Sequence, residues 1–239
     1  MGTLVAGLGG EIARLRSVVT QRWRAKGIRG YLLTMIVAAL VVLMWILDHT
    51  AAQTVVAACC GERVDAPIGG ALLRLPGSLV APAPMLPVWG SLIQVVVAFG
   101  LAEAAVGARR TLVVASSAHI VATLAGRYFV WYAPAAFGVL PPSWRSALDT
   151  GPSAATIGLA AYLAVVLGCG RLGGLVALAV GVAFVARNDL AGREHMVAIV
   201  IGGAFAAVQL LVYRLSARGA SDDISVLVPT ASEHSRNAA

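Results

Sequence analysis

Six continuous apolar stretches limit what this chain can fold into more than any other feature of its sequence. A helix needs roughly 20 apolar residues, within a range of about 17–25, to cross a hydrocarbon core of about 30 Å. The stretches are continuous rather than alternating, which favours helices over the strands of a barrel. They cover residues 31–47, 88–106, 111–132, 153–168, 172–186 and 194–213. The sequence therefore predicts an all-α integral membrane protein with six transmembrane helices.

The composition supports one membrane domain. Hydrophobic residues make up 59% of the 239 positions and charged residues only 12%, whereas a soluble domain carries roughly 25% charged residues. We expect a basic cytoplasmic segment over residues 1–30, the six-span domain over 31–215, and a polar, disordered cytoplasmic tail over 216–239.

The net charge of +7 follows from membrane topology and does not indicate nucleic-acid binding, because the basic residues flank apolar stretches. With the N-terminus inside, eleven Lys and Arg residues are cytoplasmic and five lie in outer loops, which predicts that both termini are cytoplasmic (N-in/C-in). The cytoplasmic set is Arg14, Arg16, Arg22, Arg24, Lys26, Arg29, Arg109, Arg110, Arg171, Arg214 and Arg218, and the outer set is Arg63, Arg74, Arg145, Arg187 and Arg193.

Residues 1–30 allow two interpretations. Apolar side chains from Leu8 to Trp23 recur at helical spacing among arginines, which suits a helix lying on the anionic lipids of the inner leaflet. The same segment would also serve as a charged extension that only sets topology.

The outer connection between the first two stretches, residues 48–87, is unusually long and mostly apolar. Loops of this length are commonly functional, and we expect this one to be partly sunk in the bilayer. The three cysteines, Cys59, Cys60 and Cys169, provide neither a disulfide framework nor a metal-ligand spacing. No metal or other cofactor is indicated.

The fourth stretch is short, and its start carries the first candidate site residue. About 16 residues at 1.5 Å each give roughly 24 Å, so the helix should begin inside the protein at Gly151-Pro152-Ser153. Ser153 would then lie beside free backbone N–H groups and the positive end of the helix dipole. It is a candidate nucleophile, or else a serine that caps or packs against a neighbouring helix.

His195 lies at the same predicted depth as Ser153, at the outer end of the sixth stretch. An ionisable residue inside a span suggests function, and a histidine can accept the proton of a serine. The shared depth predicts a hydrogen bond of about 2.6–3.2 Å between the two side chains. The competing histidine, His119, lies midway along the third stretch and could instead hydrogen-bond within the bundle.

Three short motifs in this chain resemble those of rhomboid proteins, in particular the divergent rhomboid-like membrane proteins of actinobacteria. Gly151-Pro152-Ser153-Ala154 resembles the Gly-x-Ser-Gly motif that opens the fourth span. The segment from Glu194 to Gly202 resembles the sixth-span Ala-His-x-x-Gly-x-x-x-Gly pattern. Gly100, Glu103 and Gly107 match the Gly-x-x-Glu-x-x-x-Gly pattern of the turn that ends the second span. The resemblance covers residues 31–215 and implies a rhomboid-like six-helix bundle in a bacterial plasma membrane.

The resemblance also implies roles for individual residues. Ser153 would be the nucleophile and His195 the general base, with Gly151 and Ala154 near the oxyanion. Glu103, Gly107, Gly202 and Gly203 would support helix packing. The chain also departs from the family pattern, and in the second span the His and Asn that help to bind the oxyanion fall on Pro87 and Ser91. Ser91 is the remaining side-chain candidate for that role. The further departures are Ile157 in place of a Tyr, Ala154 and Ala198 in place of glycines, and a Trp-Arg pair that occurs only as Trp144-Arg145.

Two functions follow from the resemblance. One is a weak or specialised intramembrane serine endopeptidase that cuts transmembrane protein substrates. The other is an inactive pseudoprotease that binds or escorts membrane client helices. A small transporter or channel subunit is a poorer fit, because the spans lack the paired charges expected around a midplane site.

Overall fold

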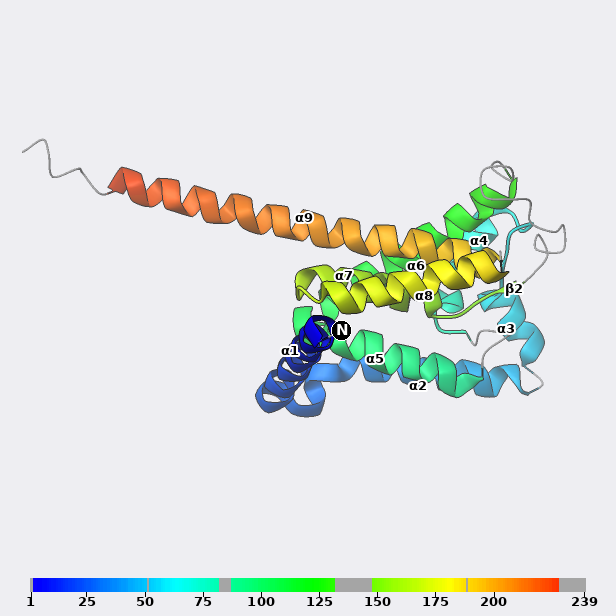
Figure 1. Cartoon of the computed structure of the whole chain (residues 1–239). Helices are drawn as coiled ribbons and strands as arrows, with labels where there is room; N and C mark the ends of the chain where they lie inside the picture. The colour runs from blue at the N-terminus through cyan, green and yellow to red at the C-terminus, as the bar shows by residue number, and fades with distance from the viewer. Residues whose placement is uncertain (1, 51, 82–86, 132–147, 188, 228–239) are drawn as a thin grey trace, which may run out of the picture.

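The computed structural model describes residues 2–50, 52–81, 87–131, 148–187 and 189–227 as a bundle of helices (Figure 1). Two short strands, β1 (Glu62–Arg63) and β2 (Leu148–Asp149), pair antiparallel in the register Glu62 with Asp149. In chain order the elements are α1 (Gly2–Lys26), the 3-10 helix η1 (Gly27–Tyr31), α2 (Leu32–Asp48), α3 (Gln53–Cys60), β1 (Glu62–Arg63), α4 (Ile68–Ser78), α5 (Val88–Val106), α6 (Ala108–Trp131), β2 (Leu148–Asp149), α7 (Ser153–Val166), α8 (Gly170–Arg187) and α9 (Leu190–Leu227).

Five helical segments in the described part of the chain are long and apolar enough to cross a membrane. They are the segment that contains α2, then α5, α6, α8, and the Leu190–Ser216 part of α9. These five helical segments confirm the prediction of an all-α membrane protein. The remaining apolar helix, α7, has 14 residues and a length of about 21 Å.

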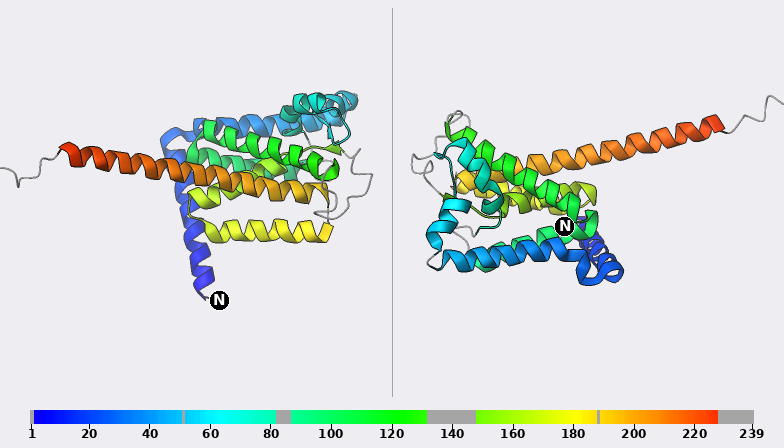
Figure 2. Two further views of the ribbon diagram at one scale, coloured as in Figure 1. Left: turned by 90° about the horizontal axis from the view of Figure 1, so that it is seen from above. Right: turned by 180° about the vertical axis from the view of Figure 1, so that it is seen from behind.

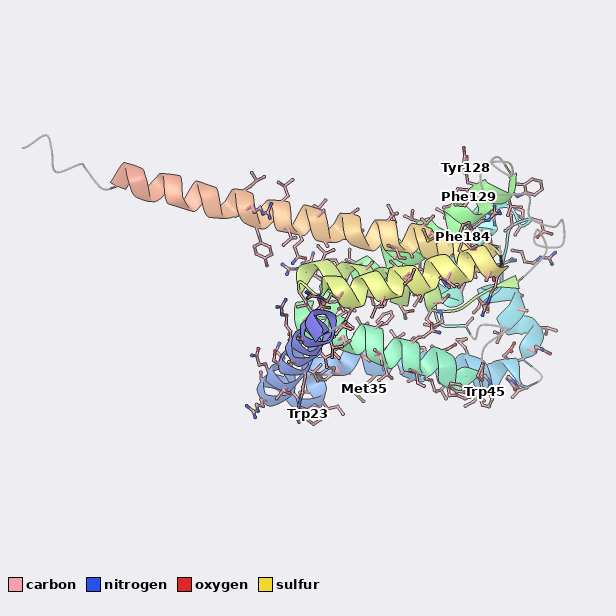
Figure 3. All side chains as sticks on the ribbon, viewed as in Figure 1. Trp23, Met35, Trp45, Tyr128, Phe129 and Phe184 are labelled. Carbon is pink, nitrogen blue, oxygen red and sulfur yellow. The ribbon has the colours of Figure 1, made fainter. Side chains whose placement is uncertain are left out.

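The short helix α7 occupies the interior of the bundle. It packs against α5, α6, α8 and α9, and Ala155 and Leu159 on it are fully buried. By contrast, α8 exposes Leu178 and Val185, as expected of a helix that faces lipid. The aromatic pair Tyr128 and Phe129 lies near the C-terminal end of α6 (Figure 3), and membrane proteins concentrate aromatic side chains at the ends of their spans. We call this end of the bundle the outer end and the opposite end the inner end, following the predicted orientation.

The N-terminal helix α1 and the C-terminal end of α9 lie at the same end of the bundle (Figures 1 and 2). Helix α9 continues through Leu227, beyond position 216, where the disordered tail was predicted to begin. Residues 228–239 of that predicted tail lie outside the described part of the chain.

Glu103 connects the inner ends of α5 and α2. Its carboxylate accepts hydrogen bonds from the Leu33 amide (3.1 Å), the Thr34 amide (2.9 Å) and the Thr34 hydroxyl (2.8 Å). The first amides of a helix have no intrahelical acceptor, so Glu103 caps α2 from a neighbouring helix. Gly107, with φ of +82°, then ends α5.

Replacing Glu103 with glutamine is expected to destabilise the bundle by about 1.5–3 kcal/mol, because the amide cannot reproduce the charge-assisted bonds to α2. The free energy of unfolding in detergent measures the effect. Asp65→Asn is the matched control, since Asp65 forms only an exposed ion pair with Arg63, worth about 0–1 kcal/mol. Equal losses for the two variants would contradict the capping role.

Helix α1 is held to the turn between α7 and α8 by two charged side chains. The Arg14 guanidinium donates to the carbonyl groups of Leu167 and Gly168. The Glu11 carboxylate accepts from the amides of Arg171 (3.0 Å) and Leu172 (2.8 Å), the first turn of α8. Burial alone would raise the pKa of Glu11, but these amides and the neighbouring arginines outweigh it and lower the pKa. Helix α1 is therefore docked onto the membrane domain.

The outer connection between α2 and α5 is held against α6 by Arg127. Its guanidinium forms an ion pair with the buried Glu62 carboxylate and donates to the carbonyl groups of Arg63 and Ala66. Trp131, one turn further along α6, donates its indole N–H to the Val64 carbonyl (3.1 Å). These contacts fix β1 and the start of α4 against the outer end of α6.

Candidate functional site

The start of α7 has the geometry that its sequence predicts. Gly151 has φ of +125°, a conformation that favours glycine, and its amide donates to the Ser78 carbonyl (2.8 Å). Pro152 precedes the helix, and the Thr156 amide donates to the Pro152 carbonyl (2.9 Å). Ser153 is the first residue of α7. Its side chain therefore lies in the turn where backbone N–H groups lack intrahelical acceptors.

The register between α7 and α9 follows from their closest contacts. A Cβ atom on Gly158 would lie 3.3 Å from the Ala198 carbonyl oxygen, and one on Gly202 would lie 2.1 Å from the Gly158 carbonyl oxygen. Only residues without a larger side chain allow such close backbones. Gly158 therefore lies opposite the part of α9 between Ala198 and Gly202. Both helices run from the outer end of the bundle inward, so Ser153, five residues before Gly158, lies level with His195.

Two further helices reach the same level. Helix α6 runs antiparallel to α7, and a Cβ on Gly158 would lie 2.4 Å from that of Ala118. Because the two helices are antiparallel, Thr123, five residues after Ala118, lies level with Ser153, five residues before Gly158. On α5, the Gln94 side chain accepts from the Thr156 hydroxyl (3.5 Å), and three residues earlier Ser91 is level with Ser153.

We call Ser91, Thr123, Ser153 and His195 the outer polar layer. Ser91 and Thr123 are buried, whereas Ser153 and His195 are partly exposed. Three of its polar atoms are buried and have no hydrogen-bond partner within the described chain: Ser91 Oγ, Thr123 Oγ1 and His195 Nε2. A buried polar group without a partner costs about 1–3 kcal/mol, and one side of the layer is open enough to leave Ser153 and His195 partly exposed. Such a site favours a ligand or water that supplies the missing bonds.

The hydrogen bond predicted between Ser153 and His195 is not formed. Among the described residues no hydrogen bond joins the two side chains, and His195 Nε2 has no partner. Their equal depth follows from helix register, whereas a bond also requires both side chains to turn toward each other. Catalytic hydrogen bonds are often long or misaligned in resting enzymes and tighten when substrate binds.

The other predicted site residues have separate positions. Ala154 is buried in a small cluster with Ala118, Ala122 and Ala198, so it supports the approach of α6, α7 and α9. Gly202 makes the close backbone contact with Gly158 on α7. A Cβ on Gly203 would meet nothing within 4 Å, and Gly203 therefore takes no part in this packing. Glu103 and Gly107 lie at the inner end of α5, away from the outer polar layer.

The sequence did not identify Ser78 as a candidate. Its hydroxyl lies 2.8 Å from His119 Nε2, and both side chains are buried, at 1% and 4% exposure. His119 therefore hydrogen-bonds within the bundle, one of the two roles left open for it. Ser78 ends α4, in the outer connection, and nothing in the sequence indicated which span that helix would contact.

No group of three or more His, Cys, Asp or Glu side chains that could hold a metal ion occurs in the described part of the chain. Comparison with protein families, with curated proteins and with solved structures finds no match to this sequence or fold. The assignment of function therefore depends on the outer polar layer and on the motifs that surround it.

Proposed function

We propose that the chain is a rhomboid-type intramembrane serine endopeptidase of the bacterial plasma membrane, weak or specialised, which cuts transmembrane protein substrates. The observation that carries the proposal is the Nε2 atom of His195, which is buried at the level of Ser153 and has no hydrogen-bond partner in the described part of the chain. A neutral imidazole with a free nitrogen at this place is suited to accept the proton of a serine.

The reaction follows from this arrangement. Ser153 Oγ attacks the scissile carbonyl carbon while His195 Nε2 takes the hydroxyl proton. The carbonyl oxygen becomes an oxyanion, and the backbone N–H groups of the first turn of α7 stabilise it, with the short Ser91 hydroxyl as a weak side-chain donor. His195 then gives its proton to the leaving amine, and an acyl-enzyme on Ser153 remains. Water, deprotonated by His195, hydrolyses this ester and regenerates the serine.

The fold supports the same assignment. A short helix that begins inside the protein lets a polar reaction centre lie below the outer surface without a full-length span. The close contact of α7 with α9 at Gly158 and Gly202 keeps the backbones that carry Ser153 and His195 near each other. The six-helix rhomboid-like architecture is a proposal on the same grounds, with α2, α5, α6, α7, α8 and α9 as its six spans.

Labelling of the purified protein by a fluorescent fluorophosphonate tests the proposal, because this reagent reacts with activated serines. We expect the wild type to be labelled slowly, Ser153→Ala to lose all labelling, and His195→Ala to lose most of it. Ser117→Ala on α6, which removes a hydroxyl outside the outer polar layer, is the matched control and should label like the wild type. Labelling that persists in folded Ser153→Ala would contradict the assignment of the nucleophile.

The missing bond between Ser153 and His195 favours one second candidate, a pseudoprotease that binds or escorts client helices. Pro87 also favours this candidate, because it precedes α5 at a position where the family pattern has a polar side chain. An absence of labelling in the folded wild type, together with retained binding of a transmembrane peptide, would favour this candidate.

We also propose anionic lipids as partners of α1. Arg16 and Arg24 lie along one shallow face of this helix with Ile12 and Thr20, and Trp23 is exposed. A helix with this composition at the inner end of the bundle is suited to an anionic leaflet.

A further inference from the structure

We infer that Ser78 and His119 are positioning residues for the nucleophile: together they fix the backbone at Gly151 and so the turn that presents Ser153. The inference rests on the proposed function, because it concerns how the reacting serine is held. Neither side chain belongs to the outer polar layer.

The first step of this connection is the pair itself. The Ser78 hydroxyl donates its hydrogen to the Leu75 carbonyl, one turn earlier in α4 (3.0 Å). Its oxygen is then free to accept, so His119 Nε2 carries a proton and donates it to Ser78 Oγ (2.8 Å). The imidazole thereby fixes the end of α4 to the middle of α6. Both side chains are buried, so the bond is protected from exchange with water.

The second step joins Ser78 to the start of α7. The Ser78 carbonyl accepts the Gly151 amide at 2.8 Å. With φ of +125°, Gly151 has a conformation that needs such support. β1 and β2 pair just before this point, so the outer connection holds the approach to α7 at two successive places.

The third step concerns catalysis. The N–H groups that would stabilise the oxyanion belong to the residues directly after Gly151 and Pro152. A displacement of about 1 Å in such donors can cost on the order of 10²-fold in rate. The packing of α7 against α6 and α9 holds Ala154 and Gly158, which follow the nucleophile. The contact from His119 through Ser78 holds Gly151, which precedes it.

The experiment uses full-length protein in detergent and two measurements. One is hydrogen–deuterium exchange at the Gly151 amide, and the other is the rate of fluorophosphonate labelling. The variants are His119→Leu, Ser78→Ala and the conservative His119→Gln, whose amide N–H can reach the same acceptor. Thr111→Val is the matched control, because it removes a buried hydroxyl bond at the other end of α6.

We expect His119→Leu and Ser78→Ala to speed exchange at Gly151 at least about tenfold and to slow labelling about 10²-fold. His119→Gln should restore most of the slow exchange at Gly151 and most of the labelling rate, and Thr111→Val should leave both quantities unchanged. Unchanged exchange at Gly151 in the folded variants, or faster exchange with unchanged labelling, would overturn the inference. If His119→Leu fails to fold, Ser78→Ala and His119→Gln still decide it. A wild type that never labels would contradict the proposed function, and exchange at Gly151 would then report separately whether the connection exists.

Discussion

Replacing Ser91 with asparagine is expected to raise the rate of fluorophosphonate labelling at Ser153 by a factor of about 10²–10³. A single good oxyanion donor is worth that much, about 2.7–4 kcal/mol. Ser91 is buried, level with Ser153, and its hydroxyl has no hydrogen-bond partner within the described chain. An asparagine reaches further and offers two amide hydrogens. The measurement is the labelling rate of the purified variant, followed by cleavage of a transmembrane peptide.

Two further variants control this experiment. Ser91→Asn combined with Ser153→Ala should lose the gain completely, which ties the signal to the proposed nucleophile. Pro87→His with Ser91→Asn tests the second departure from the family pattern, although it also removes the proline at the start of α5. The single variant is therefore the cleaner test. A folded Ser91→Asn protein that labels no faster than the wild type would count against the weak enzyme and in favour of the pseudoprotease.

Replacing Arg127 with methionine is expected to destabilise the protein by about 3–5 kcal/mol. Removing one partner of a buried ion pair leaves the other charge uncompensated, and the Glu62 side chain is only 2% exposed. The variant also removes the donors for the Arg63 and Ala66 carbonyl groups. The free energy of unfolding in detergent at neutral pH measures the loss.

Arg63→Met is the matched control for Arg127→Met. Arg63 pairs with Asp65, and the two side chains are 46% and 37% exposed, so this pair is worth about 0–1 kcal/mol. Similar losses for the two variants would show that the Glu62–Arg127 pair does not hold the outer connection.

Much of the fold could be predicted from the sequence, because apolar length directly reports membrane-spanning helices. The start of α7 at Ser153 and its short length followed from Gly151, Pro152 and the distance to Arg171. The equal depth of Ser153 and His195 also followed, since depth depends only on rise per residue. The hydrogen bond between them did not, because it depends on side-chain rotation, which spacing does not report.

The contacts made by the outer connection could not be predicted. The bond between Ser78 and His119 joins residues 41 positions apart, and the pair of Glu62 with Arg127 spans 65. Neither contact leaves a periodic signal in the sequence, because each depends on how the connection between α2 and α5 folds back onto α6. The role of His119 appears only when α4 and α6 are placed together.

The attachment of α1 has a consequence for how the protein is made. Glu11 contacts amides that lie 160 positions later in the chain, so α1 leaves the ribosome long before its binding site exists. Until the α7–α8 turn has been inserted, Glu11 and Arg14 must remain without these partners, and the basic helix is available to the lipid surface or to the insertion machinery. Docking of α1 is therefore a late step of biogenesis. A chain truncated before residue 167 would be inserted with its first helix still undocked.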